Sequence, residues 1–248
     1  GYLNINNTGG IYPSVGWTIL YALTVGSGAI FDGGELTHNI MGSMTNNGTI
    51  ASAGTLNFLP ATAKTIDFGS DFSSTGLVVL GGAGAITLAG TPDTLQDVTI
   101  SNTNGAGISP ASNWGIANNL TVRGGSILNA GSYNYWIGQN LLNNGTINSG
   151  TSNFVFNGTT HQDIYNASPF YDLTMDNSVV HADLFSDVIV NGALTFIAGN
   201  IETQDFILSQ PSSGTVIGAA QNTGWVFGNL QKNIGTGNTS KTFEVGDT

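Results

Sequence analysis

Apolar residues alternate with polar residues in short bursts along the whole chain. Leu56 and Phe58 flank an Asn, and Leu194 and Phe196 flank a Thr. Alternation with a period of two is typical of a β-strand that has one buried and one solvated face. Gly-Ser, Asn-Gly and Gly-Gly pairs separate the bursts, and such pairs tolerate the positive φ that tight corners require. The pattern predicts an all-β chain of many short strands.

A long internal repeat organises these bursts. The sequence NNGTI occurs at 46–50 and again at 143–147, and at this offset residues 13–50 share 15 identities in 38 positions with residues 110–147. A third copy begins where DLTMDN at 172–177 matches DVTISN at 97–102. We therefore predict one domain over 1–223 with three degenerate repeats at about 2–96, 97–171 and 172–223. Residues 224–248 are expected to form a terminal β segment that leads out of it.

The repeat lengths favour a parallel β-helix over a β-sandwich or a propeller. The first copy is about 20 residues longer than the second, and the surplus lies around 59–85. A solenoid accepts an extra turn of that size, whereas a closed sandwich accommodates it poorly. Asn, Thr and Ser fill the polar positions and can form ladders when strands stack in register. We predict a right-handed parallel β-helix, or β-solenoid, of about ten coils.

Composition excludes several classes of function. Fifteen acidic and four basic residues give a formal net charge of −11, so the chain lacks the Lys and Arg that nucleic-acid binding needs. No apolar run approaches the roughly 20 residues that span a bilayer, and we expect no membrane insertion. With no cysteine, disulfides, thiolate zinc sites and cysteine nucleophiles are excluded. The uncharged, Asn- and Thr-rich composition favours an extracellular location.

The chain resembles repeat regions of very large secreted Bacteroidetes surface proteins. The motifs are FYDLTMDN at 170–177, DVIVNGALTFIAGNI at 187–201, SSGTV at 212–216 and the closing GWVFGNLQKNIGTGNTSKTFEVGD at 224–247. The resemblance covers the whole chain, most clearly from Asp172 onward. It implies a parallel β-helix, export by the type IX secretion route, and a role in adhesion, gliding or matrix building. These motifs are structural, so the resemblance transfers no catalytic residues.

Many parallel β-helices degrade polysaccharides, which makes a catalytic role one alternative for this chain. A glycosidase needs two carboxylates across a substrate, and a lyase needs a strong base. The only arginine, Arg123, lies at a turn, and its repeat equivalents Gly26 and Ile197 are not basic. An isolated surface arginine is the simpler interpretation. We expect that the chain is not an enzyme and has no catalytic residues, with a polysaccharide lyase or hydrolase as the third-ranked alternative.

The candidate metal ligands are spread along the chain. Three acidic pairs have a spacing of four, which in a strand places the carboxylates about 13 Å apart, too far for one ion. They are Asp67 with Asp71, Asp172 with Asp176, and Asp183 with Asp187. The histidines, His38, His161 and His181, fall in different parts of the repeats without HExxH spacing. We expect no metal site and no cofactor, and leave open one calcium site formed by loop carbonyls and one Asp.

Several aromatic residues occur in GSYNYWIG at 131–138, where Tyr133 and Tyr135 share one side of the strand and Trp136 takes the other. If the two tyrosines point outward, they form a flat platform for sugar rings. The competing interpretation is ordinary aromatic packing on a strand. Trp17 and Trp114 are repeat equivalents for which we expect a core or stacking role. A carbohydrate-binding module using Tyr133 and Tyr135 is therefore the second functional hypothesis.

The first hypothesis is a structural and adhesive stalk segment of a large bacterial surface protein. Its expected partners are surface glycans or other copies of the same chain. Because the sequence starts within a strand pattern, we expect a longer polypeptide or a filament that covers the solenoid ends. Asp93-Thr94-Leu95 resembles the Asp-Ser/Thr-aliphatic site of Bacteroidetes O-glycans, which makes Thr94 a candidate glycosylation site.

Overall fold

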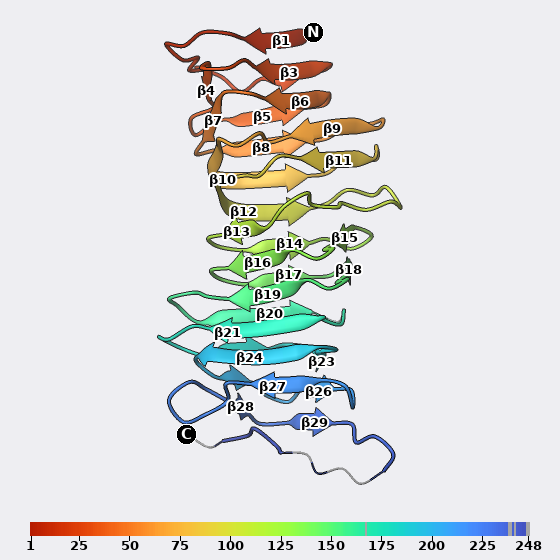
Figure 1. Cartoon of the computed structure of the whole chain (residues 1–248). Coiled ribbons are helices and arrows are strands. Elements are labelled where there is room, and N and C mark those ends of the chain that lie inside the picture. The colour runs from red at the N-terminus through yellow and green to blue at the C-terminus, as the bar shows by residue number, and fades with distance from the viewer. Residues whose placement is uncertain (167, 238–239, 241, 247–248) are drawn as a thin grey trace.

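The computed structural model describes residues 1–166, 168–237, 240 and 242–246. Its strands stack one above another from the N-terminus to the C-terminus (Figure 1). All pairings between the named strands are parallel. The chain is a β-solenoid of about 11 turns, which confirms the predicted parallel β-helix. In the described part of the chain, no helix is long and apolar enough to cross a membrane.

Strands of successive turns align in three columns, which we call the first, second and third faces. The first face contains β1 (Tyr2–Ile5), β3 (Ala22–Val25), β6 (Ser43–Asn46), β9 (Lys64–Asp67), β11 (Ile86–Ala89), β15 (Ile127–Asn129), β18 (Thr146–Asn148), β23 (Val188–Ile189), β26 (Leu208–Gln210) and β29 (Leu230–Lys232). The second face contains β4 (Ile30–Asp32), β7 (Thr49–Ser52), β13 (Trp114–Ile116), β16 (Asn134–Ile137), β19 (Asn153–Phe156), β21 (Asp172–Asp176), β24 (Ala193–Ala198) and β27 (Thr215–Ile217). The third face contains β2 (Thr18–Ile19), β5 (Thr37–Ile40), β8 (Thr55–Phe58), β14 (Leu120–Val122), β17 (Leu141–Asn143), β20 (Gln162–Asn166), β22 (Ala182–Leu184), β25 (Ile201–Glu202) and β28 (Val226–Phe227).

Two longer strands, β10 (Phe72–Leu80) and β12 (Thr94–Ile100), pass from the second face to the third. Phe72 pairs with Ile50 of β7, whereas Leu77 pairs with Thr55 of β8. A shift in register between Ser74 and Leu77 marks the corner. The faces are therefore segments of one continuous coil, joined at its corners.

One continuous apolar core runs from Ile5 in β1 to Val226 in β28. It consists of the inward rows of the three faces, because successive side chains of a strand point to opposite sides. On the second face, Trp114, Tyr135 and Phe154 occupy one such row in consecutive turns. Full burial of a large apolar side chain stabilises the fold by about 1.5–3 kcal/mol. The alternation read from the sequence thus identifies the rows that hold the turns together.

Outward amide side chains form ladders between turns, as the sequence predicted. The Asn57 amide donates to Asn39 Oδ1 at 2.9 Å, one turn away. The Asn148 amide donates to Asn129 Oδ1 at 2.8 Å on the first face. These hydrogen bonds link side chains that the parallel register places side by side.

The repeated NNGTI motif forms a corner of the solenoid. The buried Asn46 amide donates to the carbonyls of Phe68 and Asp71, at 2.8 and 2.9 Å, and its Oδ1 accepts from the Gly48 N–H. A Cβ at Gly48 would lie 2.4 Å from the Ala29 carbonyl oxygen, so no larger residue fits there. In the second copy, Asn143 Oδ1 likewise accepts from the Gly145 N–H, at 3.0 Å.

Equivalent positions of the three sequence repeats lie on different faces. The copies begin at β1 on the first face, in the second half of β12 on the third, and at β21 on the second. The copies therefore do not span whole numbers of turns, and corner motifs such as NNGTI occur on more than one edge. The solenoid also continues beyond residue 223, because Ile201 pairs with Val226 and Leu208 with Leu230. A segment leading out of the solenoid consequently starts later than the predicted residue 224.

Candidate functional site

The third face carries a column of acidic side chains on its outer surface. Asp163 of β20 pairs with Asp183 of β22, which pairs with Glu202 of β25. Two positions before each Asp, and so on the same side of the strand, lie His161 and His181. Neighbouring strands are about 4.8 Å apart, so these side chains are in direct reach of one another. We call these five residues the His–carboxylate ladder.

Each imidazole of the ladder lies between two carboxylates. His161 Nδ1 is 3.3 Å from Asp163 Oδ1, and His161 Nε2 is 3.1 Å from Asp183 Oδ2. His181 Nε2 is 3.5 Å from Asp183 Oδ1, and His181 Nδ1 is 3.2 Å from Glu202 Oε1. The two rings meet edge to face, with their centroids 4.9 Å apart. The central Asp183 therefore faces both Nε2 atoms, and the two outer carboxylates each face one Nδ1 atom.

The ladder concentrates negative charge in a half-buried place. Like charges directly opposite one another on paired strands are destabilising, and here three carboxylates follow in register. The Asp183 side chain is only 14% exposed, and the histidine and Glu202 side chains are less buried. The Oδ1 atoms of Asp163 and Asp183 are buried, and each lies against one imidazole nitrogen of the ladder. The arrangement thus favours added positive charge close to Asp183.

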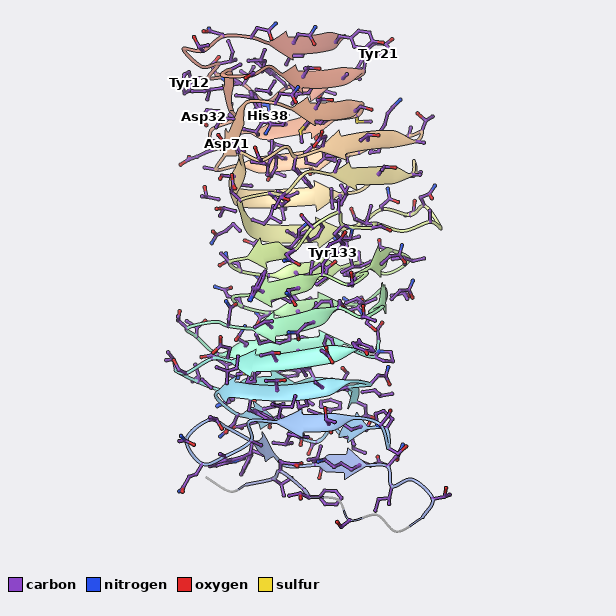
Figure 2. All side chains as sticks on the ribbon, viewed as in Figure 1. Tyr12, Tyr21, Asp32, His38, Asp71 and Tyr133 are labelled. Atoms are coloured by element: carbon purple, nitrogen blue, oxygen red, sulfur yellow. The ribbon has the colours of Figure 1, made fainter. Side chains whose placement is uncertain are left out.

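The repeat pattern did not predict that His161 and His181 lie together, because they belong to different repeat copies. The stack nevertheless brings them into adjacent turns, since Gln162 pairs with Ala182. One feature of the sequence did indicate this contact. The two histidines and the two aspartates, His161–His181 and Asp163–Asp183, have the same separation, which equals one turn of the solenoid. His38, by contrast, is fully buried, with Nε2 3.0 Å from the Gly33 carbonyl and Nδ1 accepting from the Trp17 N–H (Figure 2). Its role is structural.

The acidic pairs of the sequence analysis do not form sites as pairs. Asp67 Oδ1 accepts from the Gly69 N–H at 2.9 Å, within its own turn of chain. Asp172 Oδ1 and Asp187 Oδ1 accept from the backbone N–H groups of Ala193 and Ile207, one turn away. These carboxylates therefore hydrogen-bond to the backbone of their own turn or of the next one.

The prediction that Tyr133 and Tyr135 form an outward platform is wrong. Tyr135 is 0% exposed, and its ring stacks on Phe154 inside the rod with centroids 4.9 Å apart. Its hydroxyl donates to the Ala130 carbonyl at 2.9 Å, and burial raises the pKa of this phenol. Tyr133 is half-buried and packs against the core (Figure 2). Tyr135 lies between the buried rings of Trp114 and Phe154 in neighbouring turns. Packing against these two rings therefore determines which side of the strand faces the core.

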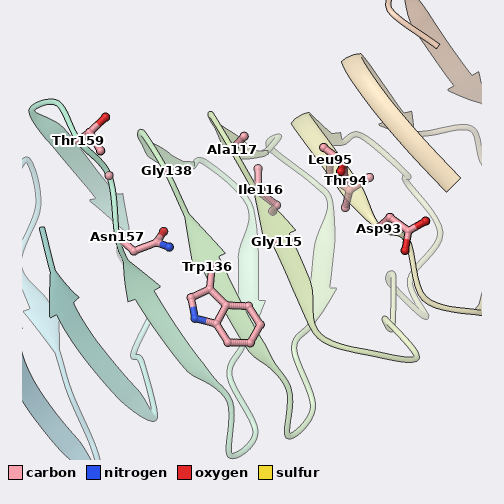
Figure 3. A pocket seen from close by; sticks show the side chains of 11 residues that line it. Asp93, Thr94, Leu95, Gly115, Ile116, Ala117, Trp136, Gly138, Asn157 and Thr159 are labelled. Atoms are coloured by element: carbon pink, nitrogen blue, oxygen red, sulfur yellow. The ribbon is translucent and has the colours of Figure 1, made fainter. Parts of the chain in front are cut away.

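Trp136 is consequently the residue of this strand that points outward. Its side chain is 36% exposed on the second face and borders a hollow of about 360 Å³ (Figure 3). Gly115 occupies the adjacent place in the outward row, where a Cβ would meet nothing within 4 Å. The missing side chain opens the hollow. Asp93, Thr94, Asn157 and Thr159 are the polar residues along its rim.

The remaining candidates are divided between the surface and the core. Thr94 is half-buried at the start of β12 and lines the same hollow, so its glycosylation stays a prediction. Arg123 is exposed at a corner after β14. Trp114 is fully buried and Trp17 packs against the core, as expected for both.

Comparison with known proteins assigns no family to the chain. No protein-family model matches the chain, and no curated protein or solved structure matches it either.

Proposed function

We propose that this chain is a rigid spacer segment of an extracellular bacterial surface protein, where it holds adhesive parts away from the cell. The single observation that carries the proposal is the unbroken core from Ile5 to Val226. Each turn contacts mainly its neighbours, so length can change by whole turns without altering the rest. With about 11 turns at about 4.8 Å each, the rod is about 50 Å long.

The surface chemistry supports an extracellular structural role. Asparagine ladders and aspartates that hydrogen-bond to the backbone occupy outward positions, as at Asn39, Asn57 and Asp172. Such groups link turns and leave little for catalysis. The net charge of −11 keeps rods apart in solution, and the resemblance to Bacteroidetes surface repeats points to the same place.

The spacer role is tested on cells of the source bacterium with two kinds of variant. Removing several whole turns should reduce surface adhesion while antibody labelling of intact cells persists. Substituting outward residues at unchanged length, for example Asn57→Ser, should leave adhesion unchanged. Adhesion that ignores length, or a chain that antibodies reach only after lysis, would contradict the proposal.

A second candidate function, carbohydrate binding, is favoured by the hollow beside Trp136. An exposed indole offers an apolar face to a sugar ring, and Asp93 and Asn157 offer polar groups at the rim. The hollow is open and shallow, which suits a chain-like ligand lying along the surface. This candidate function places the contact with the sugar ring on Trp136, in place of the buried Tyr135.

Glycan-array binding tests this second function. Trp136→Ala should abolish binding, and Gly115→Leu should do so as well by filling the hollow. Tyr171→Ala is the matched control, because Tyr171 is an aromatic residue with 37% exposure, against 36% for Trp136. Binding that survives both Trp136→Ala and Gly115→Leu would exclude the hollow as the binding site.

A further inference from the structure

The two imidazoles of the His–carboxylate ladder, when neutral, have fewer N–H groups than contacts with carboxylates. A neutral imidazole has one N–H donor and one lone pair. The two imidazoles nevertheless face carboxylate oxygens with all four of their ring nitrogens. Two of these four contacts therefore set a lone pair against a carboxylate oxygen. Either two additional protons or one divalent cation would remove this repulsion.

The positions of the nitrogens distinguish these two solutions. Both Nδ1 atoms face the outer carboxylates, His161 toward Asp163 and His181 toward Glu202. Both Nε2 atoms converge on the central Asp183. Metal-binding histidines characteristically donate the other ring N–H to a carboxylate, which fixes the ring and the tautomer. With the protons on Nδ1, the two Nε2 lone pairs and Asp183 are left free to bind one ion.

We infer that the ladder binds one divalent transition-metal ion of the Zn²⁺ class through His161 Nε2, His181 Nε2 and the Asp183 carboxylate. One ligand atom from each of these residues lies within 4.8 Å of the others. In a tetrahedral zinc site with bonds of about 2.1 Å, ligand atoms are about 3.4 Å apart. The ligand atoms would have to approach one another by up to about 1.4 Å, which is within reach of partly exposed histidine side chains that are not locked by packing.

The donor set determines the class of metal. Two imidazole nitrogens and one carboxylate oxygen suit Zn²⁺, Ni²⁺ or Cu²⁺. Ca²⁺ prefers about six to eight oxygen ligands, which the ladder does not offer. Water completes the coordination, and it has access because His181 also borders an open hollow of about 370 Å³. The site is therefore distinct from the calcium site left open by the sequence.

Metal binding would clamp successive turns of the solenoid. His161 belongs to the turn of β20, and His181 and Asp183 belong to the turn of β22. Glu202 extends the contact to β25 through the His181 ring. An ion shared by adjacent turns stabilises the folded state over the unfolded chain, where the ligands are apart.

The test titrates the EDTA-treated full chain with ZnCl₂ by calorimetry and by thermal melting. We expect one Zn²⁺ per chain and a higher melting temperature. His181→Gln should weaken Zn²⁺ binding by about 100-fold, and Glu202→Gln by about tenfold, because it removes only the carboxylate that orients His181. Glu35→Gln is the matched control, since it makes the same charge change at an exposed glutamate and should leave binding unchanged.

A second measurement on the unaltered chain keeps the test independent of how the variants fold. In ¹⁵N spectra of the imidazoles, Zn²⁺ should shift the Nε2 signals of His161 and His181 and leave those of His38 unchanged. The absence of Zn²⁺ binding would overturn the inference. Binding of equal strength in His181→Gln, or a shift of His38 alone, would overturn it as well.

Discussion

Tyr135 and Phe154 stack inside the rod, one turn apart, with ring centroids separated by 4.9 Å and planes inclined by 15°. The Tyr135 hydroxyl is satisfied within the core by the Ala130 carbonyl. A hydroxyl is thus buried within a row of aromatic rings. Because successive side chains of a strand point to opposite sides, the inward Tyr135 places the neighbouring Trp136 on the surface. This one pair determines which side of the strand faces solvent.

Replacing Tyr135 by Phe should destabilise the fold by about 1 kcal/mol, the usual net value of one buried hydrogen bond. The difference in stability between Tyr135→Phe and the unaltered chain should also depend on pH. Burial raises the pKa of Tyr135 in the fold, whereas in the unfolded chain a tyrosine ionises near pH 10. The unfolded state therefore loses its proton first, and stability falls as the pH rises above about 10. The Tyr135→Phe variant has no phenol at this position, so it should not lose stability in this way at alkaline pH.

Denaturant unfolding at several pH values measures both effects. Tyr171→Phe serves as the control, because Tyr171 is an exposed tyrosine. Identical alkaline profiles for the unaltered chain and Tyr135→Phe would show that the buried phenol does not contribute.

Gly48→Ala should destabilise the corner of the NNGTI motif by about 1–3 kcal/mol, the usual effect of overpacking. The new Cβ would lie 2.4 Å from the carbonyl oxygens of Ala29 and Gly26, which belong to backbone and cannot rotate away. Gly105→Ala is the matched control, since a Cβ there meets nothing within 4 Å. Thermal melting of the two variants should separate them clearly, and equal melting temperatures would contradict the close approach.

Deleting residues 64–85 should give a folded rod that is one turn shorter. Lys64 pairs with Ile86, so Ile86 follows Ala63 in the same register, and Leu88 takes the place of Ile66 beside Met44. Circular dichroism should keep its β signal, and small-angle scattering should show a rod shorter by about 4.8 Å. The control removes only residues 64–73, which takes away β9 and part of β10 and should prevent cooperative folding. A one-turn deletion that unfolds as readily as the control would contradict the modular stack.

The sequence predicted the β-helix and its inward rows because alternation and corner residues are local signals. It did not decide which side of GSYNYWIG is buried, because aromatic residues occupy both sides of that strand. The partners of Tyr135, which are Trp114 and Phe154, settle the question through space.

The ladder was missed for a related reason. The sequence separation between stacked residues varies from turn to turn, being 19 for Ile127 and Thr146 but 25 for Ile201 and Val226. No fixed period therefore indicates which histidines and carboxylates meet. Turn lengths are set by corners and loops, and a single sequence does not give them.

Asn46→Ala should destabilise the chain by about 1–3 kcal/mol, although it removes no apolar contact of the core. The buried amide donates to the carbonyls of Phe68 and Asp71 and accepts from the Gly48 N–H, so its loss leaves these groups unpaired. Asn46→Asp should be worse, because a buried carboxylate would face two carbonyl oxygens and no donor in place of the amide NH₂. Asn57→Ala is the control, since it removes one outward hydrogen bond to Asn39 and should change stability by at most about 0.5 kcal/mol. Denaturant unfolding of the three variants gives the order, and an Asn46→Asp chain as stable as Asn46→Ala would show that the corner does not depend on the amide donors.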